Sequence, residues 1–239
     1  FEPASYSIEP NMPVQLSHQN ERRHDVVVIG GGSAGYAAAR TACDAGADVA
    51  IVDQGPLGGL CILRGCMPTK TILRSAEIMA LMKRAREFGL APVTARADLS
   101  AIVDRKNRLV QEFADYRIAA LRDPRFTLYE SRAEFLSPHE IRAGAWHIRG
   151  EAFVIATGSR VSDVAIPGLS ESGYVTSDDM LDVRQAPASL LVLGGGLVAV
   201  EFAQFFSRIG TKVTLLQRGA TLLSDMDQDV GQALSSAFQ

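Results

Sequence analysis

The feature that most constrains this chain is a glycine spacing that occurs twice, each time directly after a short β-branched run. In the first copy, DVVVIG (residues 25–30) leads into GGSAGYAAARTACDAG, and Gly30, Gly32 and Gly35 give the spacing G-x-G-x-x-G. Such a run is typical of a buried parallel strand, and the glycines allow a tight turn, a close phosphate and close helix packing. The pattern predicts strand, turn and helix, with a pyrophosphate at the helix N-terminus.

A second β-branched run, DVAIVD, ends at Asp53, eighteen residues beyond Gly35. At about this distance a Rossmann unit places the acid that hydrogen-bonds a ribose hydroxyl. The order of these elements is far more specific than the glycine spacing alone, and predicts an α/β fold with a doubly wound, Rossmann-like domain over residues 25–165. Within it, residues 98–123 show a helical apolar period with Asp98 as N-cap, which predicts a long scaffold helix.

The second copy of the pattern begins with a strand at residues 190–194. It continues through Gly194, Gly196 and Ala199 into a helix, and then into another strand at residues 213–217. We therefore expect a second dinucleotide site, on a second Rossmann-like domain.

The acid position of this second site is held by Gln217, and Arg218 follows it. Without the carboxylate a free 2′-hydroxyl loses its usual partner, whereas a guanidinium suits a 2′-phosphate. This favours NADPH over NADH. Arg218 could equally be an ordinary surface arginine. We assign residues 166–239 to a linker and the first part of this incomplete domain.

Two of the three cysteines, Cys61 and Cys66, lie close together in GGLCILRGCMPTK. In an ideal helix residues five apart are about 8 to 9 Å apart at Cα, beyond the limit of about 7 Å for a disulfide. If the pair bonds, its segment must be an irregular turn, and the regular helix is expected after it, with Pro68 in the first turn. Arg64, Lys70 and the helix N-terminus are expected to lower the pKa of either thiol, which makes a redox-active pair.

Composition argues against several other classes of protein. The 239 residues carry a net charge of −3 and no long basic run, so we expect no nucleic-acid partner. No apolar stretch reaches the roughly 18 to 20 residues of a membrane span. Three cysteines are too few for a disulfide framework, Cys43 is expected to be a buried helix residue, and no metal ligand set is visible. Residues 1–24 lack a signal-peptide core and are expected to form an extended N-terminal arm on a cytoplasmic protein.

The chain resembles the pyridine nucleotide–disulfide oxidoreductases, the flavoprotein family that includes dihydrolipoamide dehydrogenase, glutathione reductase and mercuric reductase. The run DQGPLGGLCILRGCMPTK, which contains Gly59, is similar to the family's active-site signature, and VVVIGGGSAG, FVIATGSR, IPG and LGGGLVAVEFAQFFSRIG follow the family order. The resemblance implies FAD in the first domain, with Gly59 among its contacts, and NADPH or NADH in the second. It also implies a disulfide, dithiol or thiol-bound metal as substrate, and a homodimer at full length.

The resemblance further implies a relay from NAD(P)H through FAD to a Cys61–Cys66 disulfide and on to substrate. Cys66 resembles the thiol that packs on the flavin, and Cys61 the interchange thiol that attacks substrate. Lys70 resembles the lysine near the flavin's hydride-accepting nitrogen, with Glu201 as its partner in a buried ion pair. The other FAD contacts that the resemblance implies are Thr157, Gly158 and the backbone of Ala133.

The chain departs from the family pattern beside the cysteines. Leu60 and Leu63 stand where many members have Thr and Asn, and Arg64 follows. Arg64 would either favour an anionic disulfide or shield the thiolate. Because these residues line the disulfide, the substrate stays open among dihydrolipoamide, mercury and another thiol compound.

The second domain has only its opening β-α-β unit and a helix start near DMDQDVGQAL, which is expected to leave its strands partly uncovered. The family's C-terminal dimerisation domain, with its His–Glu acid–base pair, is not in this chain. We therefore expect a longer natural protein, or a fragment. The alternative function is a catalytically silent FAD-binding module or redox sensor.

Overall fold

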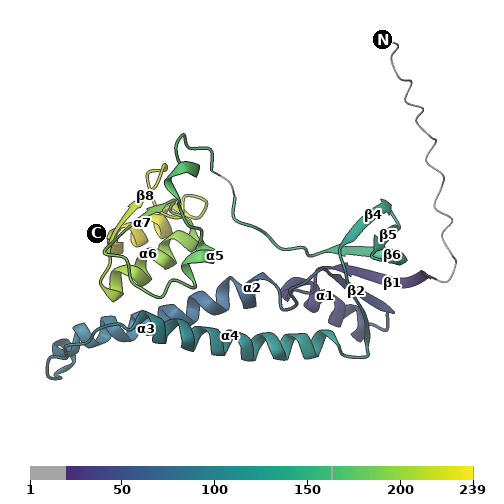
Figure 1. The fold of residues 1–239 in the computed structure, drawn as a ribbon, viewed down its shortest axis with the longest axis horizontal. Coiled ribbons are helices and arrows are strands. Elements are labelled where there is room, and N and C mark those ends of the chain that lie inside the picture. Colours follow the sequence, from purple (N-terminus) through teal and green to yellow (C-terminus); the bar gives the residue numbers. More distant parts are fainter. Residues whose placement is uncertain (1–19, 163, 239) are drawn as a thin grey trace, which may run out of the picture.

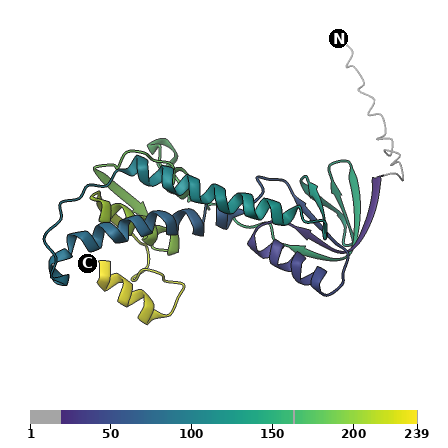
Figure 2. The same ribbon diagram turned by 90° about the horizontal axis from the view of Figure 1, so that it is seen from below.

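Two lobes joined by a pair of long helices make up the structure, which is a computed structural model describing residues 20–162 and 164–238. Helices α3 (Cys66–Lys83) and α4 (Leu99–Leu121) run side by side in both Figure 1 and Figure 2, and we call them the hairpin. The first lobe holds strands β1 to β6 with helix α1, and the second holds α5 to α7 with β7 and β8. No helix in the described ranges combines the length and the apolar character needed to cross a bilayer.

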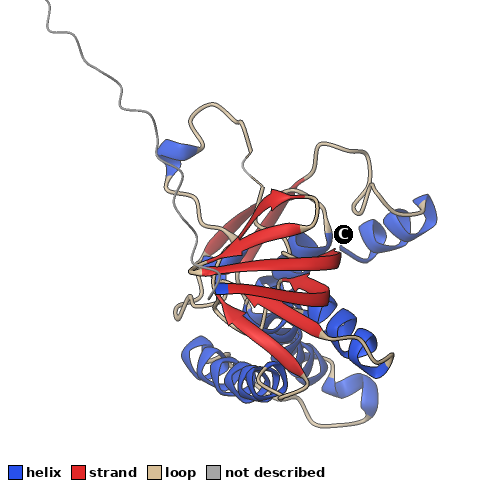
Figure 3. Ribbon diagram, turned by 90° about the vertical axis from the view of Figure 1, so that its right-hand side faces the viewer, coloured by secondary structure: helices blue, strands red, loops and turns tan. Residues whose placement is uncertain are grey.

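The first lobe is built on a six-stranded sheet with the order β3-β2-β1-β6-β5-β4, seen as the red strands of Figure 3. Strands β3, β2, β1 and β6 pair in parallel, whereas β4 and β5 form an antiparallel ribbon at one edge. This confirms the predicted α/β class with a largely parallel sheet. The bounds are β1 (Glu21–Ile29), β2 (Val49–Asp53), β3 (Phe126–Glu130), β4 (Ala133–Ser137), β5 (Glu140–Ala143) and β6 (Trp146–Ile155).

Strand β2 shows why the sequence of this sheet is continuously apolar. Its residues 49–52 are at most 1% exposed, because a central parallel strand is covered on both faces. One face packs on α1 (Ser33–Asp44) and on Leu121 at the end of α4. The other face packs on the antiparallel ribbon through Ile141 and its neighbours.

Strand β1 begins at Glu21, four residues before the predicted start. The reason is tertiary, because Glu21 to His24 pair with the first half of the long strand β6. The last residues of the predicted N-terminal arm therefore belong to the sheet, and residues 1–19 of that arm lie outside the described residues.

The predicted scaffold helix is α4. Asp98 is its N-cap and its Oδ1 accepts a hydrogen bond of 3.0 Å from the backbone N–H of Ala101, which satisfies one of the first amide groups of the helix. A short 3-10 turn, η2 (Ala85–Phe88), follows α3, and a loop then leads into α4. Cys43, predicted to be buried, is half-buried on α1, and its Sγ–H donates to the carbonyl of Arg125 at 3.3 Å.

The second lobe follows an extended segment and the short turn η3 (Ser170–Ser172). Its parallel two-stranded sheet packs one face on α6, while the other face leaves Leu191, Leu193 and Leu216 exposed, as the sequence predicted. The bounds are α5 (Ser177–Met180), β7 (Ser189–Leu193), α6 (Leu197–Ile209), β8 (Lys212–Leu216) and α7 (Gln228–Phe238).

Aromatic side chains of α6 fix the second lobe on the hairpin. Phe205 and Phe206 are fully buried, with their rings edge to face and 5.0 Å between centroids. They share a core with Ile72 and Ala76 of α3 and Val103 of α4. This packing sets where α6 lies relative to the cysteine-bearing end of α3.

Replacing Phe206 with Ala is expected to lower the free energy of unfolding by about 3 to 5 kcal/mol, because it leaves a cavity in this core. Urea unfolding followed by circular dichroism measures the loss. The matched control is Phe113→Ala on α4, where the ring is 47% exposed and the loss is expected to stay below about 1 kcal/mol. Equal losses in the two variants would contradict this account of how the lobes are joined.

Candidate active site

The first glycine turn joins the end of β1 to the start of α1. Gly30 has φ +104°, and a Cβ there would lie 2.3 Å from the carbonyl oxygen of Ala156. A Cβ at Gly35 would lie 1.7 Å from the carbonyl oxygen of Gly30, so both positions require glycine. At Gly32 the nearest atom to a Cβ would be the Cα of Gly59, at 3.6 Å. A Cβ at Gly32 would thus make only an ordinary van der Waals contact, and Gly32 borders the cavity described below.

Asp53 braces this turn from the end of β2. Its Oδ2 accepts a hydrogen bond of 2.5 Å from the N–H of Gly31, and its Oδ1 accepts one of 2.7 Å from the N–H of Gly55. Each carboxylate oxygen can accept a second hydrogen bond. The ribose contact of Asp53 stays a prediction, and the side chain has the capacity for it.

A cavity of about 310 Å³ lies over the first glycine turn, and we call it the glycine cavity. It forms where β1, β2 and β6 end, because the carboxyl ends of parallel strands meet at one edge of the sheet. The residues of the predicted first site that line it are Gly30, Gly32, Asp53, Gly59, Ala133, Thr157 and Gly158. The structure thus brings most of the residues predicted for the first nucleotide to one cavity, whereas Gly35 and Lys70 do not line it.

A break between two helices separates the cysteines. Cys61 lies in the short helix α2 (Leu60–Leu63), and Cys66 is the first residue of α3. A Cβ at Gly65 would lie 3.2 Å from the Cα of Cys61, so a glycine lets the two turns approach closely. The irregular segment agrees with the prediction, and Pro68 lies in the first turn of α3. The predicted helix start is wrong, because α3 begins at the second cysteine and not after it.

The two thiols are free and interact with one another. The hydrogen bond with the Cys61 side chain, followed by burial, raises the pKa of Cys66, while the charge of Lys70 acts in the opposite direction. The expectation of a lowered pKa is wrong for Cys66. That expectation rested on the nearby cations and the helix N-terminus, whereas the hydrogen bond with the Cys61 thiol has the larger effect on the pKa of Cys66.

A second cavity, of about 630 Å³, lies between the start of α3 and the start of α6, and we call it the cysteine cavity. Cys66, Lys70 and Glu201 line it, together with Leu197 and Val198. It shares Leu60, Arg64 and Ser159 with the glycine cavity, so the two cavities are adjacent.

Lys70 forms the ion pair with Glu201 that the resemblance implies. The Nζ of Lys70 donates to the Oε1 of Glu201, with side-chain exposures of 62% and 25%. The pair is therefore not buried as expected, because Lys70 opens onto the cysteine cavity. Glu201 comes from the second lobe, so this contact crosses from the hairpin to α6.

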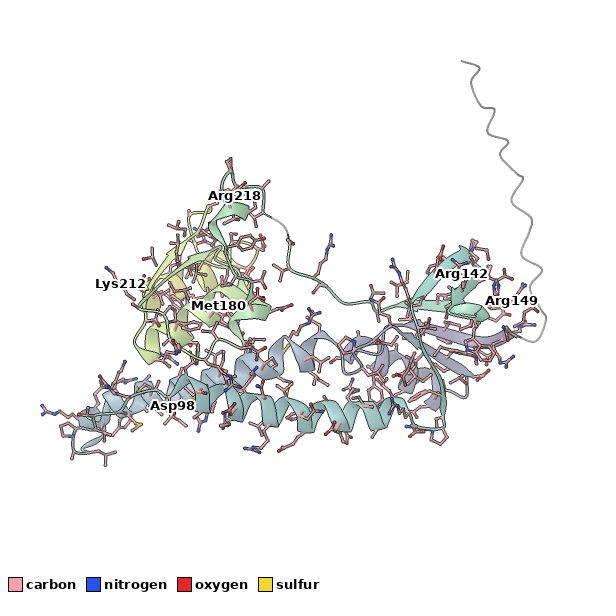
Figure 4. All side chains as sticks on the ribbon, viewed as in Figure 1. Asp98, Arg142, Arg149, Met180, Lys212 and Arg218 are labelled. Atoms are coloured by element: carbon pink, nitrogen blue, oxygen red, sulfur yellow. The ribbon has the colours of Figure 1, made fainter. Side chains whose placement is uncertain are left out.

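The second glycine turn lies in the second lobe, and Leu197 and Val198, which directly follow Gly196, line the cysteine cavity. Gly194 has φ +107°, and a Cβ at Gly196 would meet nothing within 4 Å. Ala199 lies in the first turn of α6, as the predicted fold requires. The Nε2 of Gln217 donates to the Oγ of Ser224 at 3.4 Å. Arg218 is exposed beyond the end of β8, whereas Lys212 begins that strand, and Figure 4 shows both side chains on this lobe.

A family model described as pyridine nucleotide-disulphide oxidoreductase matches residues 24–239. The chain belongs to this family. A mercuric reductase from Bacillus cereus is 34% identical over 231 residues, which cover 96% of this chain and 37% of that protein. A dihydrolipoyl dehydrogenase from Acholeplasma laidlawii is 32% identical over 223 residues, which cover 91% and 66%.

A solved structure of the same kind is the HOCl-induced flavoprotein disulfide reductase RclA from Escherichia coli. It is 31% identical with a TM-score of 0.74, over 90% of this chain and 46% of that one. The chain therefore spans less than two thirds of the length of each of these relatives. Membership confirms the resemblance stated above and implies FAD and a pyridine nucleotide as cofactors of the family.

One contact of the candidate site has no signal in the sequence. Arg64, between the two cysteines, forms an ion pair of 2.7 Å with Asp178. The two residues are 114 positions apart, and Asp178 lies in an ordinary acidic stretch. The closeness of the two side chains follows from the docking of the lobes alone.

The Cys61→Ala variant tests the cause of the raised pKa of Cys66. Removing the Cys61 thiol removes the hydrogen bond that favours the neutral form, so the pKa of Cys66 is expected to fall. The measurement is the rate of Cys66 alkylation by iodoacetamide against pH, read by mass spectrometry. Its midpoint should move to lower pH, while that of Cys43 stays in place as an internal control. A midpoint that stays or rises would show that the other thiol is not the cause.

Proposed function

We propose that this chain is the nucleotide-binding part of an FAD-dependent, NAD(P)H-linked disulfide oxidoreductase. In this proposal the Cys61–Cys66 disulfide is reduced and then reduces a small disulfide or a thiol-bound metal. The observation that carries it is the adjacency of the two cavities, one over the first glycine turn and one beside Cys66. A dithiol next to a nucleotide cradle is the arrangement that such a reaction needs.

The residues present fit FAD. The glycine cavity beside Gly32 and the N-terminus of α1 suits a diphosphate, and Asp53 suits a ribose. The cysteine cavity offers a larger space bordered by Leu197 and Val198, which suits a flat ring. When bound, FAD supplies two-electron transfer between a nicotinamide and a dithiol.

The difference between the two thiols supports different roles for Cys61 and Cys66 in the exchange reaction. Cys66 keeps its proton over a wider pH range, because its pKa is raised by the hydrogen bond with Cys61. Because Cys66 holds its proton more strongly, we assign the attack on substrate to the sulfur of Cys61. Cys61 would form a mixed disulfide and release one substrate thiol. Cys66 would then attack the Cys61 sulfur, closing the disulfide and releasing the second.

Lys70 and Glu201 would supply charge and position at the same cavity. The Lys70 cation lowers the pKa of Cys66, against the effect of the other thiol, and so favours negative charge beside it. Glu201 holds Lys70 from α6, which ties the second lobe to the active-site helix. For the second nucleotide we propose NADPH before NADH, supported by Gln217 in the acid position and by the exposed Arg218.

The test is a count of thiols after reduction. The purified chain is loaded with FAD, its cysteines are oxidised, and NADPH or NADH is added without oxygen. NADPH should release the two thiols of Cys61 and Cys66 faster than NADH, and Cys66→Ser should release none from the pair. Cys43→Ser is the matched control and should behave as the unaltered chain. Bound flavin that is reduced without release of thiols would support the silent FAD-binding module instead.

A matched pair of glycine variants tests which turn binds which nucleotide. Gly32→Ala and Gly196→Ala both fit the protein without a clash, at φ −66° and −77°. A methyl group at Gly32 should weaken FAD binding about tenfold, or about 1.4 kcal/mol, and leave NADPH binding unchanged. Gly196→Ala should weaken NADPH binding by a similar factor and leave FAD binding unchanged. Titration calorimetry measures both, and an equal loss of both ligands in one variant would contradict the assignment.

A further inference from the structure

We propose that Asp178 is a positioning residue for the Cys61–Cys66 pair, and that its ion pair with Arg64 holds the helix break in the geometry that brings the two sulfurs together. The inference rests on the proposed function, because it assigns Asp178 to closing that redox pair. It concerns only residues of this chain, and it can be tested without bound nucleotides.

Arg64 occupies the position that controls the break. It caps the end of α2, where its N–H donates to the carbonyl of Leu60 at 2.9 Å. Only Arg64 and Gly65 separate α2 from α3, and Gly65 has no side chain with which to anchor the turn. The Nη1 of Arg64 donates to the Oδ2 of Asp178 at 2.7 Å. This contact ties the break between the cysteines to α5 of the second lobe.

Asp178 is held by the structure of α5 itself. The helix begins with a capping box, in which the Thr176 side chain accepts from the backbone N–H of Asp179, and the Oδ2 of Asp179 accepts from the backbone N–H of Thr176 at 2.7 Å. Such a box satisfies the free amide groups at a helix start. Asp178 is thus a fixed partner for Arg64, with its side chain 30% exposed.

The chain after α5 is tied to α4 by two more ion pairs. Lys106, with a side chain 5% exposed, donates to Asp182 at 2.8 Å. Arg184 donates to Asp104 at 2.8 Å. The anchor of Arg64 is therefore fixed to the hairpin that carries Cys66, and this gives the Arg64 contact a defined geometry.

A role for Arg64 as a charge beside the thiols fits the structure less well. The cation that lowers the pKa of Cys66 is Lys70, while the guanidinium of Arg64 meets Asp178. An ion pair with a half-exposed arginine adds little to overall stability. Its effect should therefore appear in the geometry of the cysteines and not in the unfolding curve.

The measured reaction is thiol–disulfide exchange with glutathione. Closing the Cys61–Cys66 disulfide removes two electrons and two protons from the thiols, and oxidised glutathione takes them to give two molecules of reduced glutathione. The purified chain is equilibrated at several glutathione ratios and quenched with acid. Mass spectrometry then gives the fraction that carries the bond.

Asp178→Asn and Arg64→Gln should each lower the equilibrium constant for disulfide closure about threefold to tenfold, as for residues coupled by direct contact. The double variant should lose no more than either single one. Asp178→Glu keeps the charge and should recover part of the loss. The matched control is Glu77→Gln, which breaks a 2.7 Å ion pair with Arg74 on the same helix and should change nothing.

The outcomes separate this inference from the proposed function. Unchanged constants in Asp178→Asn and Arg64→Gln would overturn the inference and leave the proposed function standing. An equal loss in Glu77→Gln would also overturn it, since the effect would then follow from breaking any ion pair near the cysteines and not from the Arg64–Asp178 contact. If the unaltered chain forms no Cys61–Cys66 disulfide at any glutathione ratio, the proposed function itself fails.

Discussion

The first lobe depends on how closely the backbone approaches itself at the first glycine turn. A Cβ at Gly35 would come within 1.7 Å of the Gly30 carbonyl oxygen, and one at Gly30 within 2.3 Å of that of Ala156. Only glycine lets α1 begin so directly over the ends of β1 and β6. The glycine cavity exists because of this contact, since the strand ends, Asp53 and the helix N-terminus all border the same space.

The hairpin of α3 and α4 connects the first lobe to the second lobe. The phenylalanines of α6 pack on it, and this packing brings Glu201 to Lys70 and contributes to placing Asp178 beside Arg64. Both ion pairs therefore join the active-site helix and its break to elements that follow more than a hundred residues later. The segment that carries the cysteine pair borders both cavities and contacts α5 of the second lobe, and electrons would have to pass there in the reaction that we propose.

Local sequence was sufficient for the elements and for part of the chemistry. Strand β2, the Asp98 cap, the irregular segment after Cys61 and the first turn with Pro68 depend on residues near in sequence, and each was predicted. The start of β1 was not, because it depends on pairing with β6. The pKa of Cys66 was predicted in the wrong direction, because a thiol five residues away outweighs the cation that lies closer in sequence.

The sequence by itself determined the family, the two glycine turns and several of the residues that line the first cavity. It could do so because these features are set by backbone geometry that only certain residues, above all glycine, can adopt. Only the tertiary structure decided the exposure of the Lys70–Glu201 pair and the partner of Arg64. Those depend on how two lobes dock, and docking is a sum of many weak packing contacts that no short motif encodes.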